Sequence, residues 1–151
     1  MLSEGSKAPE FSLPNEAGEQ ISLSSLKGQK VVLYFYPKDD TPGCTKEACG
    51  FRDNYKLFTS KGAVVVGISA DGEKSHAKFK EKYELPFHLL ADPEKQAINA
   101  YGAWGEKKMY GKTYEGVMRY TYIINEDGVI SHVFPKVKPE EHALEVLEAI
   151  G

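Results

Sequence analysis

The stretch KVVLYFYPKDDTPGC, residues 30–44, decides the fold of this chain. Its first half, Lys30 to Tyr36, is a nearly continuous run of β-branched and aromatic residues, which is typical of a strand buried on both faces. Its second half holds turn residues and then Pro42, a residue favoured at the first position of a helix. The stretch therefore predicts a central buried strand that leads through a short loop into a helix, with Cys44 at the junction.

Strands and helices alternate on either side of this stretch. A helical pattern from Cys44 to Thr59 precedes a second buried run, Ala63 to Ser69, which predicts a β-α-β unit. The order predicts an α/β fold with a mixed central sheet flanked by helices on both faces and an N-terminal β-hairpin. The other expected strands and helices span Phe11 to Leu13, Gln20 to Leu23, Glu73 to Tyr83, His88 to Leu90, Pro93 to Tyr101, Tyr120 to Ile124, Val129 to Phe134 and Pro139 to Ile150.

Two later segments carry more specific expectations. In the closing helix, Leu144, Leu147 and Ile150 follow a helical spacing and should face the core. Between Gly102 and Gly116 lies a glycine-dotted stretch that is longer than most connections, so we expect a mobile or functional loop at the entrance to the site.

Length and composition narrow the class of protein. The chain has 151 residues, 41% of them hydrophobic and 27% charged, which fits one domain spanning residues 1–151. A net charge of −3 without a basic block argues against a nucleic-acid partner. No apolar run approaches the roughly 18 residues of a membrane helix, and residues 1–7 lack the apolar region of a signal peptide. We therefore expect a cytoplasmic protein with no membrane partner.

Cys44 and Cys49 are the most informative residues. A cytosolic cysteine pair is typically catalytic, redox-active or metal-binding. In the first turn of the predicted helix, unpartnered backbone N–H groups and the helix dipole lower the pKa of the Cys44 thiol and favour the nucleophilic thiolate. Arg119 is the candidate cation beside it, because a guanidinium stays charged and binds anions. Asp39 and Asp40 would oppose this effect if they pointed inward.

Plainer structural interpretations stand beside these. Free cysteines are often small core residues, and Cys49 lies inside the helix, where packing alone could explain it. Arg119 could be an ordinary surface residue, and Thr41 a simple N-cap, a role compatible with catalysis. The histidines lack metal-ligand spacing, so we expect no metal. They are His76, His88, His132 and His142.

The spacing of the two cysteines constrains any bond between them. Five residues along an α-helix place the Cα atoms of Cys44 and Cys49 about 8.6 Å apart. A disulfide needs a Cα separation below about 7 Å, so this bond requires the first turns of the helix to unwind. The spacing also differs from the C-x-x-C motif of thioredoxin-type oxidoreductases.

The same residues carry a resemblance to a known family. The pattern P-x-x-x-T-x-x-C at Pro37, Thr41 and Cys44 resembles the active site of the peroxiredoxins, specifically the bacterioferritin comigratory protein or Q-type branch. The likeness implies a thioredoxin-like fold and an antioxidant thiol peroxidase. It continues through APEFSLP at 8–14, TPGCT at 41–45, ACGFRD at 48–53, WGEK at 104–107 and GVMR at 116–119.

The resemblance also implies roles for individual residues. Cys44 matches the peroxidatic cysteine, Cys49 the resolving cysteine, Thr41 a hydroxyl partner of the sulfur, Arg119 its charge partner and Pro37 a shield over the pocket. A hydroperoxide would oxidise Cys44 to a sulfenic acid, which would condense with Cys49 to an intramolecular disulfide. Thioredoxin or a similar dithiol reductant would restore both thiols.

Further expectations concern the pocket and the assembly. Tyr36, Gly43 and Trp104 are the expected additional residues of the substrate pocket, and no cofactor is expected. The branch implies a monomer. Three alternatives stay open: a redox sensor that consumes peroxide only stoichiometrically, a metal carrier that uses the two thiols, and an enzyme with a one-cysteine mechanism.

Overall fold

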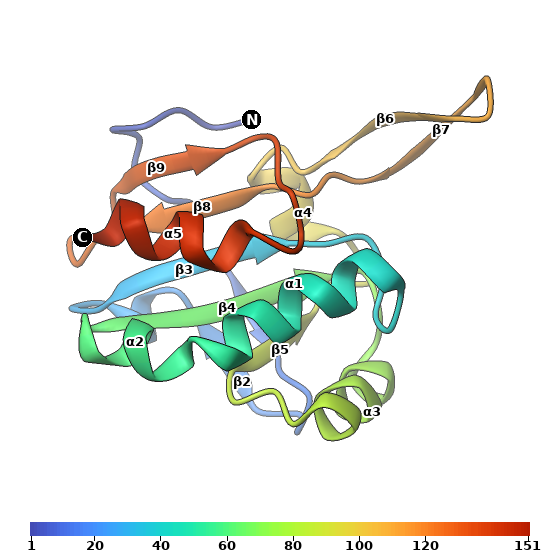
Figure 1. Ribbon diagram of the computed structural model, residues 1–151. Helices are drawn as coiled ribbons and strands as arrows, with labels where there is room; N and C mark the ends of the chain where they lie inside the picture. Colours follow the sequence, from blue (N-terminus) through green and yellow to red (C-terminus); the bar gives the residue numbers. More distant parts are fainter.

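The computed structural model describes all 151 residues and has a five-stranded mixed sheet at its centre (Figure 1). Strand β3 is the middle strand and pairs in parallel with β4 and antiparallel with β8. The expected central strand is confirmed, and Val31 to Phe35 are all buried. The order is β5-β4-β3-β8-β9, with β3 at Lys30–Phe35, β4 at Ala63–Ser69, β5 at His88–Ala91, β8 at Thr121–Ile124 and β9 at Ile130–Phe134.

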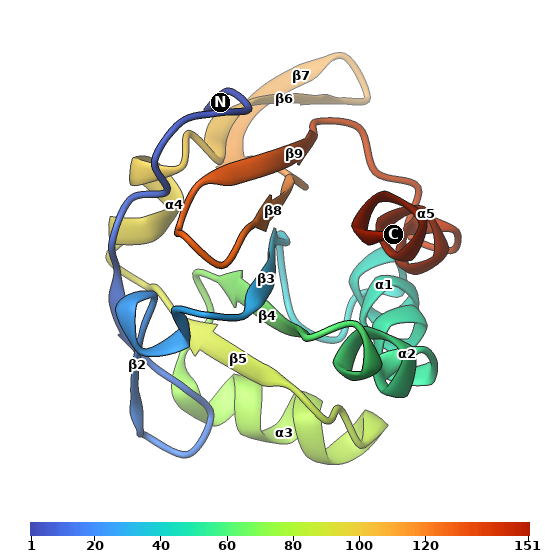
Figure 2. The same cartoon turned by 90° about the vertical axis from the view of Figure 1, so that its left-hand side faces the viewer.

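Helices cover both faces of this sheet, as the sequence predicts. Side chains of β3 alternate between two cores. Val32 and Tyr34 pack in the core beneath helices α1, α2, α3 and α5, and Leu33 and Phe35 pack in the core beneath α4 and the N-terminal segment. Figure 2 shows these two layers on opposite sides of the sheet. The helices are α1 at Pro42–Asp53, α2 at Tyr55–Ser60, α3 at Glu73–Tyr83, α4 at Gln96–Ala100 and α5 at His142–Ile150, and a short 3-10 helix, η1, spans Ser24–Leu26.

The expected N-terminal hairpin is present. Strands β1, Ser12–Pro14, and β2, Gln20–Ser22, pair antiparallel. The side-chain oxygen of Asn15 accepts hydrogen bonds from the backbone N–H groups of Ala17 and Glu19, both at 2.9 Å, which closes the turn.

Three helix boundaries differ from expectation. The single helix expected over residues 44–59 is divided into α1 and α2 at Asn54, whose side-chain amide donates to the Gly50 carbonyl at 2.8 Å and competes with the helical pattern. Helix α5 begins at His142 instead of Pro139, and helix α4 begins at Gln96 instead of Pro93. Both carboxylate oxygens of Asp92 accept hydrogen bonds from its first turn, from the backbone N–H groups of Gln96 and Ile98.

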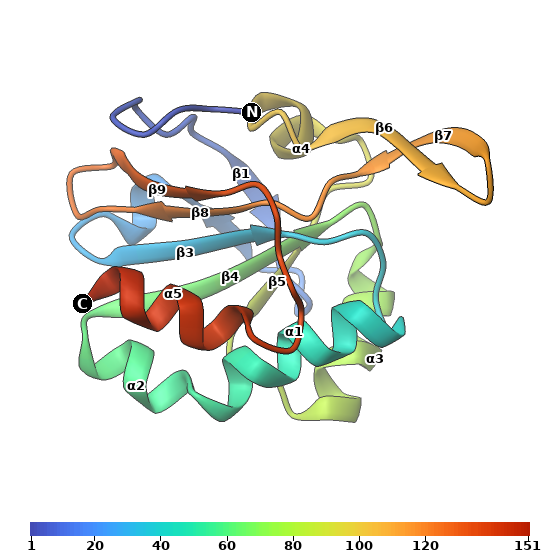
Figure 3. The same cartoon turned by 45° about the horizontal axis from the view of Figure 1, so that its top comes forward.

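The expectation of a loop between Gly102 and Gly116 is wrong. This segment forms an antiparallel hairpin of β6, Trp104–Met109, and β7, Lys112–Val117, which projects from the end of the sheet where α1 begins (Figure 3). Its turn residues, Tyr110 and Gly111, both have positive φ, as a two-residue hairpin turn requires. Most of its side chains are exposed on both faces, so the sequence shows no alternating pattern.

The expected inner face of the closing helix is partly wrong. Leu147 is buried and Ile150 half-buried, but Leu144 is 62% exposed. His142 takes an inward position instead, and its Nε2 lies 2.7 Å from the Thr121 hydroxyl. Neither this helix nor any other has the length and apolar character needed to cross a bilayer.

Candidate active site

Helix α1 follows the carboxyl end of β3 after a short loop (Figure 1), and Cys44 is its third residue. Pro42 is the first residue of the helix, and the preceding Thr41 has an extended backbone. The Cys44 side chain is only 1% exposed and belongs to the same buried cluster as Tyr34 and Tyr36. The sulfur therefore lies in the first helical turn, where backbone N–H groups lack helical partners and attract negative charge.

Arg119 reaches this sulfur from the segment before β8. Its Nη2 donates to Cys44 Sγ at 3.4 Å, the contact expected of the charge partner. Gly43 makes the approach possible, because a Cβ at that position would lie 3.1 Å from Nη2 of Arg119. The structure thus brings Cys44, Gly43 and Arg119 together.

Glu47 is a site residue that sequence reasoning missed. Its Oε1 accepts a hydrogen bond from Nη1 of Arg119 at 2.8 Å, so the guanidinium bridges this carboxylate and the sulfur. The Glu47 side chain is buried, and its Oε2 has no hydrogen-bond partner. Burial raises the pKa of Glu47 to about 7, although the charge of Arg119 opposes the shift. The available signal was the three-residue spacing from Cys44, which places both residues on one helix face.

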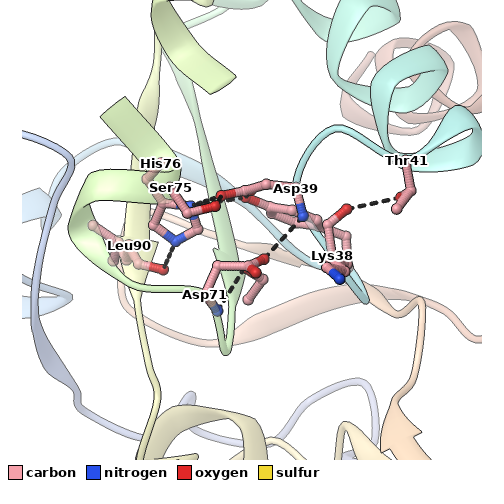
Figure 4. A network of polar contacts seen from close by, with 9 residues as sticks. Lys38, Asp39, Thr41, Asp71, Ser75, His76 and Leu90 are labelled. Atoms are coloured by element: carbon pink, nitrogen blue, oxygen red, sulfur yellow. Dashed lines mark hydrogen bonds and ion pairs between the residues drawn. The ribbon is translucent and has the colours of Figure 1, made fainter. Parts of the chain in front are cut away.

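Thr41 and Pro37 flank the start of the helix. Thr41 occupies the N-cap position, but its side chain makes no capping hydrogen bond. Its hydroxyl donates instead to the Lys38 carbonyl at 2.8 Å and closes the loop that precedes α1 (Figure 4). Pro37 is half-buried at the beginning of the same loop.

The carboxylates of Asp39 and Asp40 bind groups on α3 and make no contact with the thiol. Asp39 accepts hydrogen bonds from Tyr36 and Ser75 and contacts His76. The exposed Asp40 contacts side chains at the far end of the same helix, Lys82 and Tyr83.

Two of the expected pocket residues have other contacts. The Tyr36 hydroxyl is buried and donates to Asp39 at 2.6 Å, and its burial raises the pKa of this phenol. Trp104 packs against the core on the opposite face of the sheet from Cys44, and its Nε1 donates to Glu115 at 3.3 Å. On the same strand as Trp104, burial and the positive charge of Arg119 lower the pKa of Lys107.

Cys49 lies further along α1 and is partly exposed. Both cysteines are free thiols, and the helix between them is continuous. Burial is the main cause that raises the pKa of Cys49. Helical geometry keeps the two Cα atoms about 8.6 Å apart, so they cannot bond while α1 is intact. No group of three or more His, Cys, Asp or Glu side chains is arranged to hold a metal ion.

Comparisons with known proteins agree with this geometry. The sequence profile of the AhpC/TSA family matches residues 5–133. A putative peroxiredoxin of Coxiella burnetii is 55% identical over 143 residues, which cover 95% of each chain. Peroxiredoxin Bcp of Bacillus subtilis is 46% identical over 146 residues, covering 97% of this chain and 93% of that protein.

Solved structures show the same relationship. The bacterioferritin comigratory protein of Xanthomonas campestris superposes with a TM-score of 0.88 at 36% identity, covering 93% of this chain and 89% of that one. A PrxQ of Xylella fastidiosa gives a TM-score of 0.93 at 32% identity, with coverages of 99% and 96%. The expected thioredoxin-like fold is thereby confirmed. The chain with Cys44 at its helix start therefore belongs to the AhpC/TSA family, in the bacterioferritin comigratory protein or Q-type branch of the peroxiredoxins.

Proposed function

We propose that this chain is a thiol-dependent peroxidase that reduces hydrogen peroxide and alkyl hydroperoxides, with Cys44 as the nucleophile. The observation that carries the proposal is the hydrogen bond from Arg119 to Cys44 Sγ at the beginning of α1. A buried thiol beside a guanidinium and a helix N-terminus has the environment that stabilises a thiolate. The bacterioferritin comigratory protein of X. campestris is described by its alkyl peroxide reduction activity, which supports the organic substrates.

The first step oxidises Cys44. The thiolate attacks one peroxide oxygen, the O–O bond breaks, and the other oxygen leaves with the bonding electrons. That oxygen takes a proton and becomes water or an alcohol, while Cys44 becomes a sulfenic acid. Arg119 and the backbone N–H groups of the first turn supply donors for the charge that develops on the oxygens. Thr41 and Pro37, on the loop before the helix, complete the proposed pocket.

The second step joins the two cysteines. The thiol of Cys49 attacks the sulfenic sulfur of Cys44, water leaves, and an intramolecular disulfide forms. Helix α1 must unwind at its start, because its intact geometry separates the two residues. A dithiol protein such as thioredoxin then reduces the disulfide by exchange, which returns both thiols and permits the helix to re-form. This cycle is the atypical two-cysteine mechanism, acting in antioxidant defence and redox homeostasis.

The proposal includes the location, the assembly state and the partners of the protein. We place it in the cytoplasm as a single-domain monomer spanning residues 1–151. Its partners are a hydroperoxide and a dithiol reductant, and it works without cofactor, metal, nucleic acid or membrane.

Peroxide consumption by three proteins tests the proposal. Wild type, Cys44→Ser and Cys49→Ser are each supplied with hydrogen peroxide or tert-butyl hydroperoxide, thioredoxin, thioredoxin reductase and NADPH. We expect many turnovers from wild type and none from Cys44→Ser. Cys49→Ser should consume one equivalent and hold a sulfenic acid that dimedone traps, and oxidised wild type should be about two daltons lighter than the reduced protein.

Each contrary result identifies a different alternative. Turnover by Cys44→Ser would contradict the assignment of the nucleophile. Sustained turnover by Cys49→Ser would establish a one-cysteine mechanism. Strictly stoichiometric consumption by wild type would favour the redox sensor.

A further inference from the structure

A buried polar cluster ties the loop before α1 to α3 (Figure 4). Asp39, in this loop, is at its centre. Its Oδ2 accepts a hydrogen bond from Ser75 at 2.7 Å and lies 2.7 Å from Nδ1 of His76. Its Oδ1 accepts from Tyr36 at 2.6 Å, and its backbone N–H donates to Asp71 at 2.9 Å. These contacts connect the loop to Tyr36, which directly follows β3, to the segment after β4 and to the first turn of α3.

His76 makes polar contacts through both of its ring nitrogens. Its Nε2 lies 2.9 Å from the Leu90 carbonyl, which can only accept, so Nε2 must bear a proton. Its Nδ1 lies 2.7 Å from Oδ2 of Asp39 and 3.4 Å from the Tyr36 hydroxyl. The His76 side chain is 0% exposed and that of Asp39 is 4% exposed, so water has little access to this contact.

A second attachment holds the next residue of the loop. Asp40 has a φ of 55°, a left-handed conformation that non-glycine residues keep only when their surroundings enforce it. Its carboxylate accepts from Lys82 at 2.7 Å and from Tyr83 at 2.8 Å, both at the end of α3. Arg52, near the end of α1, donates to the Tyr83 carbonyl at 2.8 Å. Helix α3 thus fixes the loop and also the opposite end of α1.

We propose that His76 is a positioning residue for the peroxidase reaction: through Asp39 it latches the loop that leads into α1 and sets how readily the first turn of that helix unwinds. The inference deepens the proposed function, since it rests on the unwinding that a Cys44–Cys49 disulfide requires. With the latch closed, the first turn keeps Cys44 beside Arg119, ready for peroxide. With the latch open, the loop loses its attachment to α3, and the left-handed Asp40 favours its departure.

Three variants on α3 separate the latch from general packing. Ser75→Ala removes one hydrogen bond to Asp39 at a half-buried helical position, where alanine has a high helix propensity. His76→Phe retains an aromatic ring and removes all three polar contacts of the imidazole, with Tyr36, Asp39 and Leu90. Phe79→Leu is the packing control, because the buried Phe79 ring packs against Tyr36 and Tyr83 but makes no hydrogen bond with the loop.

Amide hydrogen exchange of the reduced protein is the first measurement, since it involves no cysteine chemistry. The Thr45 N–H donates to the Thr41 carbonyl at 2.8 Å and reports on the first turn of α1. Loss of a hydrogen bond to the Asp39 carboxylate should speed exchange of the Thr45 N–H about tenfold in Ser75→Ala and by more in His76→Phe. Phe79→Leu should leave the ratio of Thr45 exchange to core exchange unchanged. Wild-type exchange at Thr45 in Ser75→Ala would overturn the proposal, even if His76→Phe failed to fold.

Rapid-mixing kinetics then tests the consequence for the reaction. In Ser75→Ala we expect disulfide formation about tenfold faster, with the rate constant for peroxide attack on Cys44 nearly unchanged. Equal slowing of both steps would contradict a latch. If exchange at Thr45 accelerates but no disulfide forms even in wild type, the latch stands and the two-cysteine mechanism fails.

Discussion

Replacing Glu47 with glutamine should make the protein more stable at pH 8, although the change removes the carboxylate partner of Arg119. The Glu47 side chain is buried, and one of its oxygens has no partner. Its ionised form is therefore poorly solvated, which is why its pKa rises from the ordinary 4.5 to about 7. Glutamine has nearly the same shape and keeps an oxygen that can accept from Arg119, but it never ionises.

The size of the effect follows from proton linkage. Between the ordinary pKa and the raised one, the folded protein holds a proton that the unfolded chain has lost, so the free energy of unfolding falls as pH rises. Each unit of pKa shift corresponds to about 1.4 kcal/mol, so Glu47 destabilises the fold by about 3 kcal/mol above pH 7 and by nothing below pH 4. Glu47→Gln should lack this contribution, matching wild type near pH 4 and exceeding it by about 3 kcal/mol at pH 8.

Urea unfolding of both proteins across this pH range, with a reductant that keeps the thiols free, measures the difference directly. The control is Glu140→Gln, since Glu140 is exposed in the folded protein and should be hydrated in both states. Its curve should run parallel to that of wild type. A stability difference between Glu47→Gln and wild type that stays constant from pH 4 to pH 8 would refute the reasoning.

Three further predictions concern the site and the closing helix. Arg119→Ala should lower the second-order rate constant for oxidation of Cys44 by about 100-fold or more without unfolding the domain; an unchanged constant would remove Arg119 from the reaction. Gly43→Ala should slow the same step, because its Cβ would displace the guanidinium, and circular dichroism should show an intact fold. Leu144→Ala should change the free energy of unfolding by less than about 0.5 kcal/mol, whereas Leu147→Ala should lower it by about 2 kcal/mol or more; denaturant titrations that gave equal losses would contradict the observed inner face of α5.

The strands and the nucleophile could be predicted because their signals are local. The run from Lys30 to Tyr36 is apolar enough to specify a strand covered on both faces, and Pro42 marks the start of the helix beside it. The pairing of Arg119 with Cys44 could not be predicted from local signals, since the two residues are 75 positions apart. Its charge made it a candidate, and the family resemblance singled it out.

The missed features depend on partners that are distant in sequence or on exposure. A glutamate in a helix ordinarily faces water, whereas Glu47 is buried and pairs with Arg119, 72 residues away. The orientations of Asp39 and Asp40 depend on α3, which follows more than 30 residues later. Hairpin β6–β7 was not predicted because neither of its faces is buried enough to require an alternation of apolar and polar residues.

That hairpin also presents strand edges that another copy of the chain could approach. Strands β6 and β7 pair only with each other, so the outer edge of each presents backbone groups that could accept another strand. Near the turn, Tyr110 is 96% exposed and Met109 is also exposed, which would favour such pairing. Lysines occupy the same region at positions 107, 108 and 112. A strand from a second copy that brought its own lysines against these would be repelled, and lysines placed in this way are a common protection of exposed strand edges.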